Sequence, residues 1–247
     1  MIPEGIHTLI DATDNEPHRF PPTLIFNEGW MIRLMMSWFQ SHHLSGNVLQ
    51  FHDRATWFSE ALLPTPFKPR SRRDPRGETR THADGMIGHF TVGSAAKVDV
   101  MLLPQATQLV VIEAKIHSPL SRRTLHASTY DQAARNVACI AELLRRAHRL
   151  PSDFQSLAFV VIAPQQHIKE GGITAKLEKL SIEKAVRSRA QDFSPELDAW
   201  LEDWFIPTLE TIRIELLSWE HLICDIAAID EHTSQGFTMF YERCLTL

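Results

Sequence analysis

A chain of 247 residues with 44% hydrophobic residues is long and apolar enough to bury a full core, which excludes wholesale disorder. The formal net charge of −5 argues against binding of nucleic acid through overall charge, so such binding would depend on local basic segments. No apolar run approaches the length of a membrane helix, and the first residues lack the basic and apolar regions of a secretory signal. The cysteines Cys139, Cys224 and Cys244 are isolated, so we expect reduced thiols, a cytoplasmic location and no membrane partner.

The first predicted helix covers residues 23–39 and is strongly apolar. Glu28 shares one face of this helix with Leu24, Met31, Met35 and Phe39. A lone carboxylate on an apolar stripe is costly to bury unless it meets a cation or hydrogen-bond donors, which makes Glu28 a candidate functional acid. The alternative is that Glu28 simply lies near the helix N-terminus, where the helix dipole favours an acid and solvent is close.

A proline-rich segment at residues 64–80 predicts a loop with a local excess of positive charge. Against Asp74 and Glu78 it carries Lys68, Arg70, Arg72, Arg73, Arg76 and Arg80. Basic side chains on a loop are suited to binding phosphates, with an affinity that falls as salt rises. The alternative is an ordinary solvated surface loop.

Residues 81–90 predict a strand that contains Asp84, followed directly by Gly85. An Asp-Gly pair at this point is equally typical of a bulge or a turn. We therefore rank Asp84 second among candidate metal ligands, as an accessory to Asp99 or a replacement for it.

Two short apolar segments, residues 97–103 and 109–116, flank a polar link and predict two strands joined by a tight connection. Antiparallel pairing would bring Asp99, near the start of the first strand, beside Glu113 and Lys115 at the end of the second. Glu113 and Lys115 are two residues apart, so on a strand they point to the same face. Two carboxylates suit a hard cation such as Mg²⁺, and a nearby lysine can orient or deprotonate a water. The alternative is that these charges mark only the solvated end of a strand.

A helix is predicted from about residue 128 to about 149, after a loop that carries Arg122 and Arg123. Gln132 and Asn136 lie one turn apart near its start and share a face that can look toward the carboxylates. The alternative is that both amides are ordinary solvent-facing residues.

The order of Asp99, then Glu113-Ala114-Lys115, then Gln132 to Asn136 resembles the PD-(D/E)XK nuclease superfamily, of the RecB and restriction-endonuclease type. The resemblance covers residues from about 24 to 165. It implies an α-β-β-β-α-β core around a mixed sheet, and hydrolysis of nucleic-acid phosphodiester bonds that depends on Mg²⁺ or Mn²⁺. Two positions depart from the pattern: Val98 replaces the proline that names the superfamily, and Asn136 stands where the RecB type usually has tyrosine.

The resemblance also implies a role for each matching residue. Asp99 and Glu113 would be metal ligands, and Glu28 would be the further acid that the family carries on a preceding helix. Lys115 would act on the attacking water, and Gln132 would complete the site from the following helix. DNA is the expected substrate, with a 5′-phosphate on the product; RNA remains open. The basic residues Lys68, Arg70, Arg72, Arg73, Arg76, Arg80, Arg122 and Arg123 are the expected nucleic-acid contacts.

The remaining chain predicts a buried central strand at residues 155–164 and then helices to the C-terminus, including one at 209–217. We expect these helices to cover the sheet and to offer a homodimer surface. The whole is thus predicted to be a single α/β domain over residues 1–247, with a restriction-endonuclease-like core and a helical C-terminal elaboration from about residue 170.

The sequence also allows two alternatives to the nuclease function. The first is a catalytically silent nucleic-acid-binding or scaffold protein of the same fold. The second is a small-molecule enzyme in which the motif is accidental, in which case Asp99, Glu113 and Lys115 would not converge.

Overall fold

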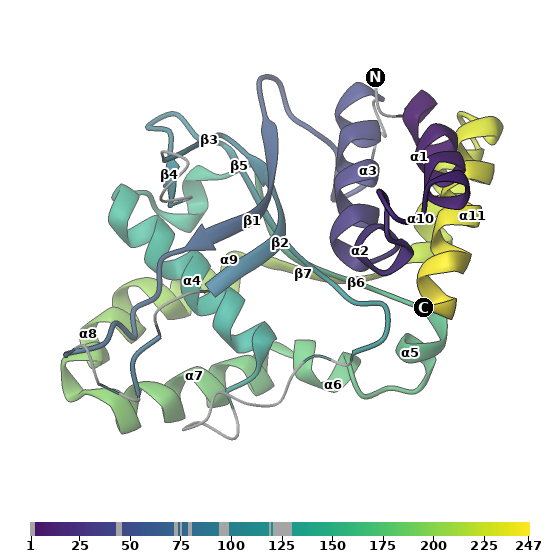
Figure 1. The fold of residues 1–247 in the computed structure, drawn as a ribbon. Coiled ribbons are helices and arrows are strands. Elements are labelled where there is room, and N and C mark those ends of the chain that lie inside the picture. The colour runs from purple at the N-terminus through teal and green to yellow at the C-terminus, as the bar shows by residue number, and fades with distance from the viewer. Residues whose placement is uncertain are drawn as a thin grey trace.

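The structure is a computed structural model that describes residues 3–42, 46–71, 74, 76–78, 81–93, 99–118, 120 and 130–247. A five-stranded mixed sheet forms its centre, with helices on both faces (Figure 1). In spatial order the strands are β1 (Thr56–Leu63), β2 (Thr81–Gly88), β5 (Gln108–Ala114), β6 (Ser156–Ala163) and β7 (Arg213–Ser218). The first three strands run antiparallel to their neighbours, whereas β5, β6 and β7 are parallel.

Two layers of helices cover the sheet. One face is covered by α1 (Pro3–Asn15), α2 (Pro22–Ile25), α3 (Glu28–Ser41), α10 (Trp219–Ala227) and α11 (Glu231–Thr246). The other face is covered by α4 (Gln132–Ala147), α6 (Thr174–Leu177), α7 (Lys179–Phe193), α8 (Asp198–Trp200) and α9 (Ile206–Thr211). The connections contain α5 (Gln165–Lys169), the 3₁₀ turns Pro151–Asp153 and Pro195–Leu197, and a π-helical turn at Leu201–Phe205. Among the described residues, no helix is both long and apolar enough to cross a membrane.

The sheet separates two hydrophobic cores. In β5, Leu109 and Val111 face the core under α4. Val110 and Ile112 face the core under α3. All residues of β5 are buried, as expected for a strand covered on both faces. By the same alternation, Glu113 falls on the α4 side of the sheet.

The predicted hairpin between residues 97–103 and 109–116 is wrong. The strand β4 (Val100–Leu102) pairs instead with β3 (Phe90–Val92) in a separate two-stranded sheet, and the antiparallel neighbour of β5 is β2. Gly88 of β2 allows this pairing, because a Cβ there would lie 2.2 Å from the backbone oxygen of Gln108. A buried strand needs a long apolar partner, and β4 is only three residues long with Met101 largely exposed.

The predicted helix over residues 23–39 is divided in two. The chain leaves helical geometry at Phe26, and α3 begins after Asn27, whose side chain accepts the N–H of Trp30 at 3.0 Å. Leu24 therefore does not share the buried face and is 65% exposed. Glu28 becomes the first residue of α3.

The C-terminal part is not purely helical, because residues 213–217 of the helix predicted at 209–217 belong to the edge strand β7. Leu216 packs toward the α4-side core and Leu217 toward the α3-side core, which is the alternation of a strand. The predicted central strand at 155–164 is confirmed as β6.

Candidate active site

The site forms where β2 separates from β5. The β1–β2 ladder continues to the pair Leu63↔Thr81, but the β2–β5 ladder ends at Gly85↔Ile112. Asp84 is the first residue of β2 beyond that last pair. Its Oδ2 atom accepts the backbone N–H of Ala114 at 2.7 Å. A carboxylate thus lies in the fork between the two strands, against the carboxyl end of β5.

Glu113 enters the same region from β5 and is 2% exposed. Its Oε1 atom accepts Lys115 Nζ at 2.6 Å and Gln132 Nε2 at 2.6 Å. Its Oε2 atom accepts Asn136 Nδ2 at 3.0 Å. Both amides come from the first turns of α4, which Asp131 caps by accepting the N–H of Ala134 at 3.0 Å. The buried carboxylate is therefore held by one cation and two amides.

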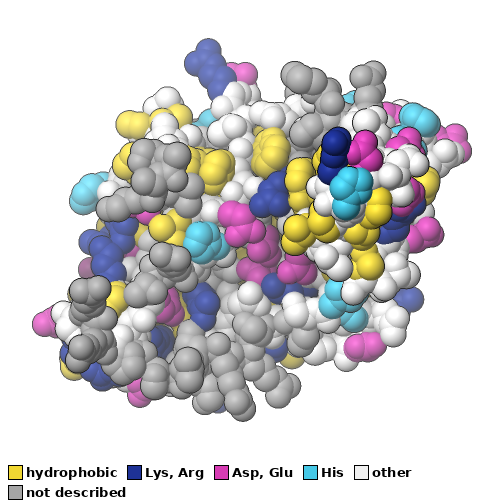
Figure 2. All heavy atoms as spheres, in the orientation of Figure 1, with side chains coloured by type: hydrophobic (Ala, Val, Ile, Leu, Met, Phe, Trp, Pro, Cys, Tyr) yellow, Lys and Arg dark blue, Asp and Glu magenta, His cyan; other side chains and the backbone are white. Residues whose placement is uncertain are grey.

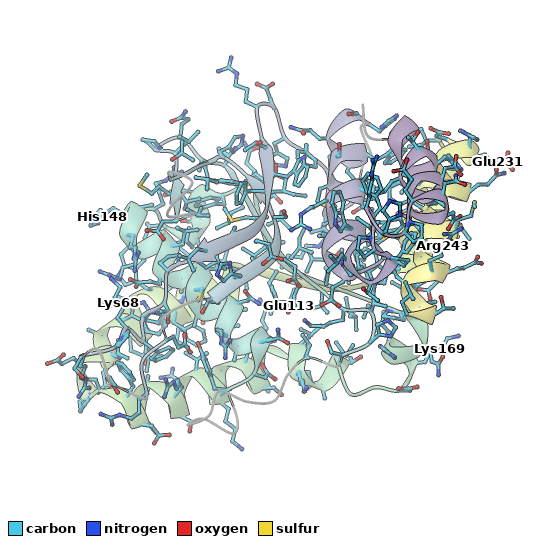
Figure 3. All side chains as sticks on the ribbon, in the orientation of Figure 1. Lys68, Glu113, His148, Lys169, Glu231 and Arg243 are labelled. Atoms are coloured by element: carbon cyan, nitrogen blue, oxygen red, sulfur yellow. The ribbon has the colours of Figure 1, made fainter. Side chains whose placement is uncertain are left out.

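Glu28 approaches from the α3 side, where Asn27 sets the start of the helix. Its Oε2 atom accepts the backbone N–H of Ile116, just beyond β5, at 3.0 Å. Three carboxylates from α3, β2 and β5 thus meet at the end of one strand. Figure 3 places Glu113 near the centre of the molecule, and Figure 2 shows acidic side chains gathered there on the surface.

The electrostatics of this cluster favour an added cation. Burial, followed by the charge of Glu113 and more weakly that of Glu28, raises the pKa of Asp84 to about 7. Burial opposes the charge of Lys115, but the neighbouring carboxylates of Glu113, Asp84 and Glu28 outweigh it and raise the pKa of Lys115. Lys115 is consequently an ammonium at neutral pH, able to donate hydrogen bonds but not to accept a proton.

The donor set fits a magnesium ion. Mg²⁺ is usually bound by one or two carboxylates, with waters and substrate phosphate oxygens completing the shell. Asp84 and Glu113 would supply the carboxylates, and the carbonyl of Ala114 points to the same strand edge as its N–H. Within the described ranges, no group of three or more His, Cys, Asp or Glu side chains is arranged so that it could hold a metal ion by itself. An ion here would therefore be held by two carboxylates, with waters and substrate oxygens in the remaining positions.

The structure brings together four of the five predicted catalytic residues and leaves one apart. Glu28, Glu113, Lys115 and Gln132 converge. Asp99 does not, because it bridges to Leu62 of β1. Since the other edge of β1 is paired with β2, both strands lie between Asp99 and β5.

Asp84 takes the position expected of Asp99. The sequence offered one sign of this role, an acid followed by a glycine in an apolar strand, and it was equally typical of a turn. Asp99 instead lines a surface pocket together with Lys68 and Arg146. Arg33 and Ser59, which lie beside the fork, were not recognised from the sequence, because neither belongs to a motif there.

The described part of the basic loop is largely occupied by contacts within the chain. Arg70 donates to the backbone oxygen of Phe193, and Arg76 Nη1 donates to that of Asp192 at 3.3 Å, both at the end of α7. Lys68 is exposed and lies far to the side of Glu113 in Figure 3. The other predicted contacts, Arg72, Arg73, Arg80, Arg122 and Arg123, lie outside the described residues.

Comparison of the chain with protein-family profiles, with curated proteins and with solved structures finds no match. The functional assignment therefore depends on the geometry and chemistry of the fork between β2 and β5.

Proposed function

We propose that this protein is a metal-dependent nuclease of the PD-(D/E)XK type, with a restriction-endonuclease-like core, that hydrolyses phosphodiester bonds of DNA. One observation carries the proposal. Asp84 is hydrogen-bonded to the strand that carries Glu113, and Lys115 forms a 2.6 Å ion pair with that same Glu113. An acid, a second acid and a lysine thus occupy the end of one strand, which is the arrangement that the resemblance implies once Asp84 replaces Asp99.

Asp84 and Glu113 would hold Mg²⁺ or Mn²⁺, with Glu28 as a further acid on the α3 side. When bound, such an ion supplies charge neutralisation to a phosphodiester and lowers the pKa of water. The raised pKa of Asp84 favours this assignment, because a divalent cation offsets the burial and the repulsion from Glu113 that keep the proton on Asp84.

Lys115 would act as a donor. Its pKa is raised, so the ammonium orients a water or a nonbridging phosphate oxygen. Gln132 and Asn136 hold both oxygens of Glu113 and so keep that carboxylate from rotating out of the site. These groups position the reactants before reaction, which is how a protein lowers the barrier to phosphoryl transfer.

The two alternatives are less well supported. A silent binding protein has no need to bury Glu113 and Asp84 beside each other, since burying like charges costs stability. A small-molecule enzyme with an accidental motif would leave Asp99, Glu113 and Lys115 apart. Asp99 is indeed apart, but Asp84 supplies the acid in the same set.

The test is cleavage of linear, circular and single-stranded DNA, and of RNA, in Mg²⁺, Mn²⁺ or EDTA. We expect metal-dependent cutting of DNA that Lys115→Ala abolishes. Lys169→Ala, on α5 and away from Glu113 in Figure 3, is the matched control and should cut as the wild type does. Cutting that survives in Lys115→Ala, or folded wild-type protein that cuts no substrate with any metal, would contradict the proposal.

A further inference from the structure

Arg33 of α3 lies along the β1–β2 side of the fork. Its Nε atom donates to Ser59 Oγ of β1 at 2.8 Å. Ser59 pairs with Gly85, the residue next to Asp84. The preceding residue, Ile32, packs over the same glycine, since a Cβ on Gly85 would lie 3.3 Å from Ile32 Cγ1. The packing of α3 on the sheet thus places the guanidinium over β1, across from Gly85, the residue that follows Asp84.

The orientation of this guanidinium is fixed. Its central carbon lies 5.8 Å from the centre of the Trp30 ring, and a Cβ on Gly29 would lie 3.2 Å from Arg33 Nη1. Gly29 directly follows Glu28, so the guanidinium spans from the start of α3 to β1. A preorganised arginine loses less rotamer entropy when it binds an anion.

The positive charge of Arg33 is poorly neutralised. Its nearest carboxylate, Glu60, is 3.9 Å away and 53% exposed, and that distance is too long for a hydrogen bond. In the described residues, neither terminal nitrogen of Arg33 forms a hydrogen bond. By contrast, Arg145 places two nitrogens on Glu142, and Arg243 places two on Asp14. The side chain of Arg33 remains 31% exposed, so its terminal N–H groups can reach a ligand.

The backbone of Glu60, the residue that follows Ser59, is distorted. Glu60 has a φ of 57°, in the left-handed region, and it lies between the pairs Ser59↔Gly85 and Ala61↔Ala83. Such a backbone in a strand is strained for a residue other than glycine. The distorted residue therefore lies next to Arg33 and opposite Asp84.

We propose that Arg33 forms a second phosphate-binding position, which takes the backbone phosphate adjacent to the one being cleaved. This inference rests on the proposed nuclease function and specifies how its substrate is held. Lys115 lies on the α4 side of the sheet and Arg33 on the α3 side, where it is bonded to Ser59, the partner of Gly85. A guanidinium whose two terminal nitrogens make no hydrogen bond among the described residues matches the oxygens of a phosphodiester. It also explains how a chain of net charge −5 holds DNA while Arg70 and Arg76 bind α7.

The test compares Arg33→Gln and Arg33→Lys with Arg187→Gln, which removes one charge from the outer surface of α7. DNA binding is measured in Ca²⁺ at several salt concentrations, and cleavage is measured in Mg²⁺. We expect Arg33→Gln to bind about 10-fold more weakly and to lower the slope of log affinity against log salt by about one. KM should rise by a similar factor with kcat little changed, Arg33→Lys should recover part of the loss, and Arg187→Gln should match the wild type.

The outcomes separate the two proposals. A wild-type protein that cuts DNA while Arg33→Gln keeps its affinity, salt slope and KM would overturn the Arg33 assignment alone. A wild-type protein that binds but does not cut would overturn the nuclease, and the salt slopes would still decide the role of Arg33. A wild-type protein that neither binds nor cuts overturns both. Arg33→Lys keeps the comparison valid if Arg33→Gln fails to fold.

Discussion

Asp84 Oδ2 accepts the backbone N–H of Ala114 at 2.7 Å, at the residue where β2 leaves β5. This single bond connects an acid from one strand to the strand that carries Glu113, although the two residues it joins are 30 positions apart in the chain. It continues the line of the sheet ladder with a side chain in place of a backbone carbonyl. The proposed metal ligands are thereby held by the sheet itself rather than by a loop.

Asp84, and not Asp99, is predicted to be the acid that is essential for cleavage. Asp84→Asn should lower metal-dependent cleavage by at least about 100-fold, because it removes a carboxylate from the proposed metal ligands. Asp99→Asn is the matched control, and should retain activity because β1 and β2 separate Asp99 from β5. Initial cleavage rates in Mg²⁺ check the pair. The reverse result, with Asp99→Asn inactive and Asp84→Asn active, would mean that the fork is not the site.

The stability of the protein should depend on pH through Asp84. Its pKa is raised from 3.8 in the unfolded chain to about 7 in the fold. Between these values the folded state keeps a proton that the unfolded chain has lost, so this stabilisation is fully present below about pH 4 and is lost as the pH rises through 7. Asp84→Asn removes this dependence.

Urea unfolding in EDTA at pH 5 and pH 8 measures the effect. From pH 5 to pH 8, the free energy of unfolding of the wild type should fall by about 2 kcal/mol more than that of Asp84→Asn. This value is discounted for the partial exposure of the Asp84 side chain. Added Mg²⁺ should recover stability at pH 8 in the wild type and less so in Asp84→Asn. Identical pH profiles for the two proteins would show that Asp84 does not carry the raised pKa.

Glu113→Gln should separate catalysis from binding. The variant keeps the size of the side chain but removes its charge, so metal-dependent turnover should fall by at least about 100-fold while DNA is still bound. The exposed Glu170 of the α5 region offers a control, Glu170→Gln, with unchanged turnover. Turnover by gel assay and affinity by fluorescence anisotropy check both. Full activity of Glu113→Gln would exclude Glu113 as a ligand.

The amides of α4 are predicted to act through Glu113. Gln132→Ala and Asn136→Ala should each reduce activity about 10- to 100-fold. Asn136→Ala removes the amide donor to Glu113 Oε2, and Gln132→Ala leaves Oε1 with Lys115 as its remaining donor. Raised Mg²⁺ should partly rescue them if the loss is one of carboxylate positioning. Asn136→Ala should also destabilise the fold by about 1–3 kcal/mol, since Glu113 Oε2 is buried. Wild-type activity of both variants at low Mg²⁺ would indicate that these amides do not position the Glu113 carboxylate for catalysis.

Local patterns were sufficient for several elements of this fold. The sequence predicted the helix that carries Gln132 and Asn136, because its apolar residues recur at helical spacing. It also predicted the buried strand at 155–164, because a strand covered on both faces is a continuous apolar run. The shared face of Glu113 and Lys115 followed from strand alternation alone and agrees with their ion pair. Glu28 was selected by the cost of burying a carboxylate. In the structure it is half-buried at the start of α3, as the alternative had it, and it accepts the N–H of Ile116.

Local sequence patterns did not predict which strands pair with each other. The segments at 97–103 and 109–116 are neighbours in sequence and both apolar, which favours a hairpin. Their separation in the structure depends on Gly88, whose lack of a Cβ lets β2 approach Gln108. Similarly, residues 209–217 were predicted to be a helix, although β7 begins at Arg213. A segment this short fits the periods of a helix and of a strand about equally well.

The sequence by itself determined the α/β class, the buried strands and the chemistry of the residues beside Glu113, since these depend on properties read within a few positions. The tertiary structure alone decided that Asp84 and not Asp99 joins Glu113, and that Arg33 bonds to Ser59, the partner of Gly85. Both outcomes depend on which strand edges hydrogen-bond across long separations in the chain. That choice is made by the packing of two cores against one sheet, where each backbone N–H and C=O must find a partner.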